Sequence, residues 1–384
     1  MPLYKNDLEA ITSAVRRFVD ERLIPAEAHV AEADAIDPAI VEGMRDLGLF
    51  GLSVPEEFGG LGLTMEEEVL VMFELGRASP AFRSLAATNV GIGSQGISID
   101  GTPDQKTKYL PRIATGELIG SFALTEPNVG SDAGAVQTRA RREGDVYVLN
   151  GTKRFITNAP RAGVFTVMAR TDAGKPGASG VSAFIVEAGT PGLSIGKPEV
   201  KMGQKGSHVA DVIFDECRVP AENIIGGIEG RGFHTAMKVL DRGRLGIAAA
   251  CTGFAERILD ESVDYAAGRK QFGKAIAEYQ LIQAMIADSR TEALASRAMV
   301  LETARAKDAG RDVGIEASCC KLFASEMVGR VADRNVQIHG GAGYIADYPA
   351  ERHYRDVRLY RIYEGTSEIQ RLKIGRDTIR ARAR

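Results

Sequence analysis

The segment Tyr363-Glu364-Gly365-Thr366 places one carboxylate where it could act as a base. Glu364 lies between the apolar dipeptide Ile362-Tyr363 and a glycine, immediately before an expected helix. A carboxylate in such surroundings can be partly removed from water, which raises its pKa and makes it a better proton acceptor. A glutamate at a helix N-terminus is more often a simple partner of the helix dipole, so the pattern alone leaves both interpretations open.

Two further segments have residue types suited to binding an anion or the edge of a heteroaromatic ring. The segment 123–132, ALTEPNVGSD, lies where helical patterning gives way to strands. Its Thr125 and Ser131 offer hydroxyl groups, and Gly130 permits close approach to the backbone. The segment 337–344, QIHGGAGY, follows an expected helix. Composition alone favours a domain-joining turn for the first segment and a helix C-cap for the second.

Two glycine-rich segments resemble nucleotide-binding motifs but lack their structural context. Residues 91–96, GIGSQG, match GxGxxG, but that motif requires a preceding strand and a following helix. Residues 268–274, GRKQFGK, approximate a P-loop, but Ala275 stands where Ser or Thr would ligate Mg²⁺. The five histidines are scattered without ligand spacing. We therefore expect neither nucleotide motif to function as such and no metal site.

Composition argues against the membrane and disordered classes. Of the 384 residues, 44% are hydrophobic and 26% are charged, and the net charge of −3 gives no attraction to nucleic acid. The longest uncharged stretch, 84–99, is too short and too polar to span a bilayer, so we expect no membrane insertion. Four cysteines without CxxC spacing indicate free thiols, and residues 1–10 lack the apolar region of a secretory signal. These features predict a cytoplasmic location.

Helical, then strand, then helical patterns follow one another along the chain. Apolar residues at three- and four-residue steps predict a helix over 8–23 that ends before Pro25, and further helices over 38–47, 64–75 and 103–115. Short β-branched and aromatic runs predict a small barrel or sandwich with strands over 164–169, 181–186 and 209–214. Asn150-Gly151 predicts a hairpin turn between strands over 145–149 and 153–157. A bundle is predicted by helical patterns over about 234–266, 279–309 and 314–338 and from 366.

The segments TEPxxGSD, QxxGGxGY and YEGT occur together in one order, and through them the chain resembles the acyl-CoA dehydrogenase family over essentially its whole length. Supporting matches are VPEEFGG at 54–60, KRFITN at 153–158 and RKQFG at 269–273. The resemblance implies an α+β, mostly α fold with an N-terminal helical domain (1–120), a middle β-barrel domain (121–232) and a C-terminal four-helix bundle (233–384). It also implies FAD, an acyl-CoA substrate, electron-transferring flavoprotein as electron acceptor, a homotetramer and a role in β-oxidation.

Carried over residue by residue, the resemblance assigns the catalytic base to Glu364. Contacts to the flavin fall on Phe122, Leu124, Thr125, Gly130, Ser131, Phe155, Ile156 and Thr157. Contacts to the pyrophosphate and adenosine of a neighbouring subunit's FAD fall on Arg269, Phe272, Gln280, Gln337, Gly340 and Gly341. Thr366 and Glu368 fall at further FAD positions, and contacts to the CoA substrate fall on Ser131, Asp241, Arg244 and Gly365. Many relatives have tryptophan at the place of Phe155, but phenylalanine also offers a flat apolar wall.

The implied reaction is α,β-dehydrogenation of an acyl-CoA thioester to a trans-2-enoyl-CoA, in which Glu364 removes the α-proton and flavin N5 accepts the β-hydrogen as hydride. Alternatives on the same scaffold are acyl-CoA oxidase, desulfinase-like or monooxygenase-like chemistry, and a further alternative is a CoA- or flavin-binding protein without turnover. Gly243 lies where isovaleryl-like and long-chain subgroups place their catalytic glutamate. Glycine there resembles the short-chain and short-branched-chain subgroups, so we expect acyl chains of about four to eight carbons.

Overall fold

The first third of the chain is helical, as the spacing of its apolar side chains predicted. The computed structural model describes residues 5–383, so residues 1–4 of the expected N-terminal domain lie outside the described residues. Thr64 and Thr102 each begin a helix with a capping box, in which the threonine side chain accepts from the backbone N–H three residues later and that residue's side chain accepts from the threonine N–H. The helices here are α1 (Lys5–Phe18), α2 (Ile24–Ala33), α3 (Pro38–Asp46), α4 (Met65–Leu75), α5 (Pro80–Thr88), α6 (Gln95–Asp100) and α7 (Pro103–Ala114).

The prediction that the first helix ends before Pro25 is wrong. A π-helical segment, Val19–Leu23, joins α1 directly to α2, and Pro25 lies in the first turn of α2. The wider π turn shifts the hydrogen-bond pattern, and proline is tolerated where its missing N–H has no intrahelical acceptor. The chain therefore stays helical as far as Ala33, and Asp34 ends the helix with a positive φ of 49°.

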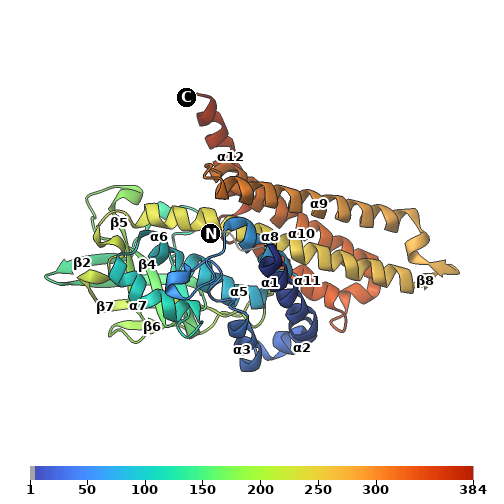
Figure 1. Cartoon of the computed structure of the whole chain (residues 1–384), viewed down its shortest axis with the longest axis horizontal. Helices are drawn as coiled ribbons and strands as arrows, with labels where there is room; N and C mark the ends of the chain where they lie inside the picture. Colours follow the sequence, from blue (N-terminus) through green and yellow to red (C-terminus); the bar gives the residue numbers. More distant parts are fainter. Residues whose placement is uncertain (1–4, 384) are drawn as a thin grey trace.

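A curled, barrel-like sheet occupies the middle of the chain and lies at one end of the molecule (Figure 1). Its strands are β1 (Gly120–Ala123), β2 (Arg139–Glu143), β3 (Val146–Thr157), β4 (Val164–Arg170), β5 (Val181–Glu187), β6 (Leu193–Ile195) and β7 (Val209–Pro220). They are ordered β1-β4-β2-β3-β7-β6, with β5 also paired to β4. Buried aliphatic and aromatic side chains alternate along these strands, so one face of the sheet encloses a core of its own. In that core the rings of Tyr147 and Phe184 meet edge to face.

The predicted turn at Asn150-Gly151 is also wrong, because β3 runs straight through both residues. The hairpin turn lies earlier, between the paired residues Glu143 and Val146. Gly151 instead lies at an irregularity in the pairing of β3 with β7, where a Cβ atom would be 2.6 Å from Thr138 Oγ1. Glycine there permits close packing of the strand and does not reverse the chain.

The last third of the chain is helical, as predicted: α8 (Gly232–Gly268), α9 (Gln280–Asp308) and α10 (Gly314–His339) pack side by side in a bundle, and α12 (Ser367–Arg382) contacts α10 and projects from the molecule (Figure 1). A short helix that the sequence did not predict, α11 (Pro349–Val357), packs against α10. The two-residue strands β8 (Lys270–Gln271) and β9 (Lys274–Ala275) form a hairpin between α8 and α9, at the end of the bundle far from the sheet (Figure 1). α8 contacts β4 and β5 as well as α4, α9 and α10, so this one helix connects all three regions.

The predicted domain boundaries stay predictions; in the structure β1 begins at Gly120 and α8 begins at Gly232. Within residues 5–383, no helix combines the length and apolar character needed to cross a bilayer. The same residues bring together no group of three or more His, Cys, Asp or Glu side chains that could hold a metal ion.

The loop that follows β1 is fixed to β3 by a buried ion pair. Lys153 Nζ lies 2.7 Å from Glu126 Oε1 and donates a second hydrogen bond, of 3.1 Å, to the carbonyl oxygen of Leu124. The Glu126 carboxylate also accepts hydrogen bonds from the backbone N–H groups of Gln137 and Thr138. Burial acts to raise the pKa of Glu126, but Lys153 and these donors hold it below its ordinary value. Burial also lowers the pKa of Lys153, to about 8.

We expect Lys153→Met to lower the free energy of unfolding by about 3–5 kcal/mol, because it leaves the Glu126 carboxylate buried without a counter-charge. Urea-induced unfolding followed by circular dichroism measures this loss. The double variant Lys153→Met/Glu126→Gln removes the buried charge and keeps an acceptor for one of the two backbone N–H groups, so it should recover part of the stability. A single variant as stable as the wild type would contradict this role for the ion pair.

Candidate active site

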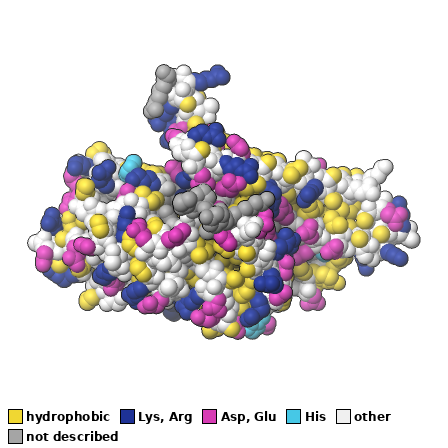
Figure 2. All heavy atoms as spheres, in the orientation of Figure 1, with side chains coloured by type: hydrophobic (Ala, Val, Ile, Leu, Met, Phe, Trp, Pro, Cys, Tyr) yellow, Lys and Arg dark blue, Asp and Glu magenta, His cyan; other side chains and the backbone are white. Residues whose placement is uncertain are grey.

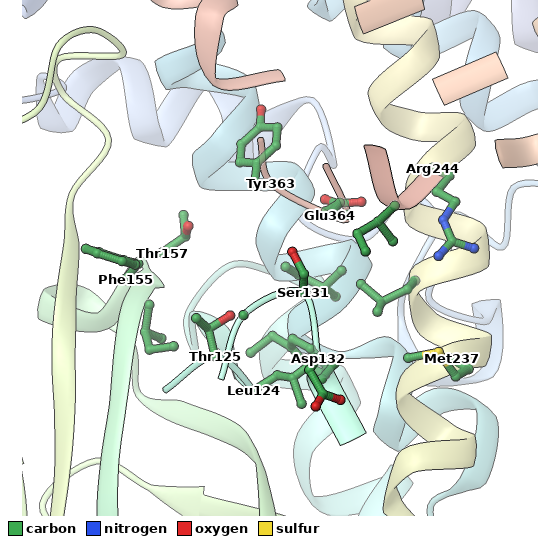
Figure 3. Close-up of a pocket in the computed structure, with 18 of the residues that line it drawn as sticks. Leu124, Thr125, Ser131, Asp132, Phe155, Thr157, Met237, Arg244, Tyr363 and Glu364 are labelled. Atoms are coloured by element: carbon green, nitrogen blue, oxygen red, sulfur yellow. The ribbon is translucent and has the colours of Figure 1, made fainter. Parts of the chain in front are cut away.

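A pocket of about 540 Å³ lies where the sheet, α5, α8 and the segment before α12 meet (Figure 3). Its wall combines apolar side chains with a few hydroxyl and charged groups, the usual character of a small-molecule site. The structure brings many of the residues predicted from the sequence to this wall: Phe122, Leu124, Thr125, Gly130, Ser131, Phe155, Ile156, Thr157, Arg244, Glu364 and Gly365.

The Glu364 side chain enters the pocket from the segment before α12 (Figure 3). Its Oε2 atom is buried and has no hydrogen-bond partner within residues 5–383. Burial raises the pKa of Glu364 above its ordinary value, while the positive charges of Arg83, Lys321 and Arg244 act in the opposite direction. The carboxyl group is therefore placed as a base of raised basicity and has no hydrogen-bonded structural partner.

A strained turn aims this carboxylate. Glu364 has a φ of +53°, and Gly365 follows with a φ of +91°. Lys321 Nζ on α10, a fully buried group, donates a 2.7 Å hydrogen bond to the carbonyl oxygen of Gly365. Gln370 Nε2 on α12 donates to the carbonyl oxygens of Glu364 and Gly365 at 3.1 and 3.2 Å. Thr366 accepts a bond from the N–H of Ile369 and so begins α12 directly after the turn.

Sequence reasoning missed Lys321 and Gln370, which hold the turn from two different helices. A signal for Lys321 was present, because it is the one charge in the run ASCCKLFAS (317–325), which the helix buries. Gln370 gave no comparable signal, since a glutamine near the start of a helix is an ordinary residue there.

Gly243 on α8 faces the same carboxylate. A Cβ atom at Gly243 would lie 2.5 Å from Glu364 Oε2, so the absence of a side chain there leaves room for the glutamate. The sequence singled out Gly243 as a second possible position for a carboxylate, and the structure places it next to the first.

The residues predicted to contact the flavin form one wall of the pocket (Figure 3). Phe155 lies at a bulge of β3 with a φ of +58°, which leaves its ring 58% exposed on the pocket side of the strand. Hydroxyl groups of Thr125, Ser131 and Thr157 line the same wall. A flat ring beside several hydroxyl groups fits a planar heteroaromatic system with polar edges, as the isoalloxazine ring of FAD is.

Arg244 and Asp241 lie one turn apart on α8. Arg244 is 6% exposed and lines the pocket, and its Nη1 donates a hydrogen bond to Asp241 Oδ1. Asp241 does not line the pocket itself, so it acts on the site by orienting Arg244.

The other predicted cofactor residues lie elsewhere in the chain. Arg269, Phe272, Gly340 and Gly341 line a second pocket, of about 630 Å³, at the β8 end of the bundle. Gln280 begins α9 and Gln337 lies in the last turn of α10, but neither lines this pocket. Thr366 and Glu368 line neither pocket, and Glu368 is exposed, with Oε1 3.9 Å from Nη1 of Arg371.

Comparison with known proteins agrees with these features. Models of the acyl-CoA dehydrogenase N-terminal, middle and C-terminal domains match residues 5–117, 121–217 and 230–379. The mitochondrial short-chain specific acyl-CoA dehydrogenase of Homo sapiens is 41% identical over 373 residues, covering 97% of this chain and 90% of that protein. Subunit CarC of the caffeyl-CoA reductase-Etf complex of Acetobacterium woodii is 42% identical over 345 residues, covering 90% of each chain.

The solved structure of butyryl-CoA dehydrogenase from Megasphaera elsdenii superposes with a TM-score of 0.94 and 36% identity, covering 99% of this chain and 100% of that chain. The family, the three-region fold and the FAD cofactor expected from the sequence are thus confirmed. The chain belongs to the acyl-CoA dehydrogenase family and is an FAD-binding oxidoreductase that acts on acyl-CoA.

Proposed function

We propose that this enzyme catalyses α,β-dehydrogenation of an acyl-CoA thioester to a trans-2-enoyl-CoA, with Glu364 as the base that removes the α-proton. The observation that carries the proposal is the buried Oε2 atom of Glu364, which has a raised pKa, no hydrogen-bond partner within residues 5–383 and open access to the pocket. A carboxylate kept for structural reasons would be paired, as Glu126 is by Lys153.

Each group on the pocket wall has a separate part in this reaction. Thr125, Phe155 and Thr157 line the wall that would hold FAD, and the bound flavin would supply the acceptor for the β-hydride. The backbone N–H of Glu364 has no acceptor among the described residues and is available to polarise the thioester carbonyl, which makes the α-proton more acidic. Arg244 and Ser131 lie on the same wall and are available to the CoA portion of the substrate.

A relative named as a reductase subunit favours one alternative, in which the same residues work in the opposite direction. Glu364 would then return a proton to the α-carbon, as microscopic reversibility requires.

Anaerobic addition of an acyl-CoA distinguishes a dehydrogenase from a protein that binds the thioester without turnover. Bleaching of the flavin absorbance supports dehydrogenation, and an unchanged spectrum supports a binder without turnover. Oxygen consumption during turnover would indicate an oxidase.

A homotetramer in which subunits share cofactor sites is supported by the separation of the two pockets. One FAD cannot contact both groups of predicted residues in a single chain, because the second group lies at the far end of the bundle (Figure 1). Apolar side chains are also exposed across the bundle surface (Figure 2). Phe272 is 93% exposed, Leu281 81% and Leu294 60%. Such surface is typical of a subunit interface.

Electron-transferring flavoprotein is the proposed acceptor of the electrons, supported by the relative that is named as a subunit of an Etf complex. A role in β-oxidation and a cytoplasmic location complete the proposal, and both stay predictions.

We expect Glu364→Gln to bind FAD and acyl-CoA but to reduce the flavin about 10²- to 10⁴-fold more slowly, because the amide cannot accept the α-proton. Stopped-flow absorbance under anaerobic conditions measures the rate. In the wild type the rate should fall as the pH is lowered through the raised pKa of Glu364, because the base must be ionised to act.

The double variant Glu364→Gln/Gly243→Glu should recover a measurable rate of flavin reduction, since Gly243 faces the same carboxylate position. Wild-type speed in the single variant would refute the assignment.

We expect Arg269→Ala to lose FAD more readily on dialysis, because a charge-assisted contact to the pyrophosphate of a neighbour's cofactor is removed. The FAD content and the oligomeric state should change together, as measured by absorbance and by size-exclusion chromatography with light scattering. Arg112→Ala, at an exposed residue of α7, is the matched control. Unchanged FAD retention in Arg269→Ala would argue against cofactor sharing at this position.

We expect the highest activity on acyl chains of about four to eight carbons, because Gly243 leaves room beside Glu364 without a second carboxylate, which is the pattern of the short-chain and short-branched-chain subgroups. The values of kcat/KM for a series of acyl-CoA substrates, straight and branched, test this expectation. An optimum near about sixteen carbons would place the acyl chain elsewhere.

A further inference from the structure

Two lysine side chains are fully buried among residues 5–383, and they differ in what pairs with them. Lys153 forms its ion pair with the carboxylate of Glu126. Lys321, on α10, is likewise 0% exposed, but its hydrogen bond goes to the neutral carbonyl oxygen of Gly365. A buried ammonium group normally has a carboxylate partner, because removing its charge from water is otherwise costly. Lys321 is therefore a buried charge that the packing of α10 does not explain.

The hydrogen bond to Gly365 does not require a positive charge. Gln370 Nε2, from α12, donates to the same carbonyl oxygen at 3.2 Å and to that of Glu364 at 3.1 Å, and its amide is neutral. A neutral donor in place of Lys321 would also hold the turn, without the cost of a buried charge. What distinguishes Lys321 from Gln370 is the charge, and a group in the same turn that responds to that charge is the carboxyl group of Glu364.

The other acidic groups that act on Lys321 are already paired or neutral. Glu326, on the same helix, has its Oε2 atom 2.9 Å from Nη2 of Arg361. Cys251, on α8, is fully buried, and burial raises the pKa of its thiol, so the thiol stays neutral. The ionised carboxylate of Glu364 is thus the negative charge that acts on Lys321 without a partner of its own.

Positive charges from three helices favour the ionised form of Glu364, namely Arg83 (α5), Arg244 (α8) and Lys321 (α10). Arg244 already donates to Asp241, which offsets part of its charge. The neighbouring hydroxyl groups of Tyr360 and Tyr363 are buried, and burial raises the pKa of both, so they stay uncharged. Of the three positive groups, Lys321 is the one that is also bonded to the turn, so it can fix both the position and the charge of the base.

We propose that Lys321 is a positioning residue that keeps Glu364 available as an ionised base: its hydrogen bond fixes the turn, and its charge favours the carboxylate over the carboxylic acid. The inference rests on the proposed function, because it concerns the base of that reaction. The effect is reciprocal, since the negative charge of Glu364 acts to raise the pKa of Lys321, which burial lowers. When Glu364 takes up the α-proton, Lys321 loses this compensation, so release of that proton to water after turnover is favoured.

The pH dependence of flavin reduction tests the role of the charge. At saturating acyl-CoA, the rate falls at low pH along an acid limb that reports the ionisation of Glu364. Lys321→Met removes the charge, so we expect this limb to move upward by about one pH unit. The variant should be about tenfold slower below the limb and should approach the wild-type rate above it. A merely structural role would slow the reaction equally at every pH. Lys321→Arg, which keeps the charge, should keep the wild-type limb.

Gln370→Leu is the matched variant for position without charge. We expect it to lower the rate of flavin reduction at every pH and to leave the acid limb where it is in the wild type, because Gln370 holds the turn through a neutral amide. Lys108→Met, at an exposed residue of α7, is the control for loss of a lysine. An acid limb that moves in Gln370→Leu would show that the geometry of the turn sets the ionisation, and would overturn the inference even if no Lys321 variant folded.

Infrared difference spectra record the ionisation of Glu364 without turnover. In the FAD-loaded enzyme free of substrate, the carboxylic acid band that Glu364→Gln lacks reports the protonated base. We expect Lys321→Met to keep this band to a pH about one unit higher than the wild type does. Equal titration of the band in both proteins would contradict the role of Lys321. Failure of the proposed function is distinguishable, because Glu364→Gln would then reduce its flavin as fast as the wild type, whatever the titration of the band.

Discussion

The active site depends on keeping one carboxyl group buried without a hydrogen-bond partner for Oε2. Glu364 can hold this position only because the backbone around it is fixed from outside: Lys321 and Gln370 bind the carbonyl oxygens of the turn. A φ of +53° at a glutamate is costly, and it persists where the surrounding structure determines it. The bundle helices α10 and α12 thus place the base, and the pocket supplies its environment.

Three positive charges lie near this carboxyl group, and they differ in whether another group already pairs with them. Lys321 donates a hydrogen bond to the carbonyl oxygen of Gly365, and Arg244 donates one to Asp241. Arg83 alone has no such partner among the described residues. Each of the three favours the ionised form of Glu364, whereas burial opposes it more strongly, so the net effect is a raised pKa.

Sequence reasoning identified site residues that neighbour one another along the chain, and most of its failures come from contacts between distant segments. The segments at 123–132 and 363–366 were identified because their residue types and order are specific. Asn150-Gly151 was misread because the contact that requires Gly151, with Thr138, comes from another part of the sheet region. Pro25 was misread because a π-helical segment admits it. Arg83 and Lys321 were overlooked because a charge within an apolar helix has a meaning only once its surroundings are known.

The position of α8 explains why these distant parts act as one site. This helix contacts the strands β4 and β5, carries Arg244 and Gly243 past the pocket, and ends beside the hairpin that bears Phe272. Its close crossing with α4 requires Gly253, where a Cβ atom would lie 2.0 Å from the carbonyl oxygen of Phe73. Because α4, α8 and α10 pack in one continuous core, Arg244 on α8 and Lys321 on α10 are both held close enough to Glu364 to act on its pKa. The electrostatic balance at the base is therefore set by the same contacts that join the N-terminal helices to the bundle.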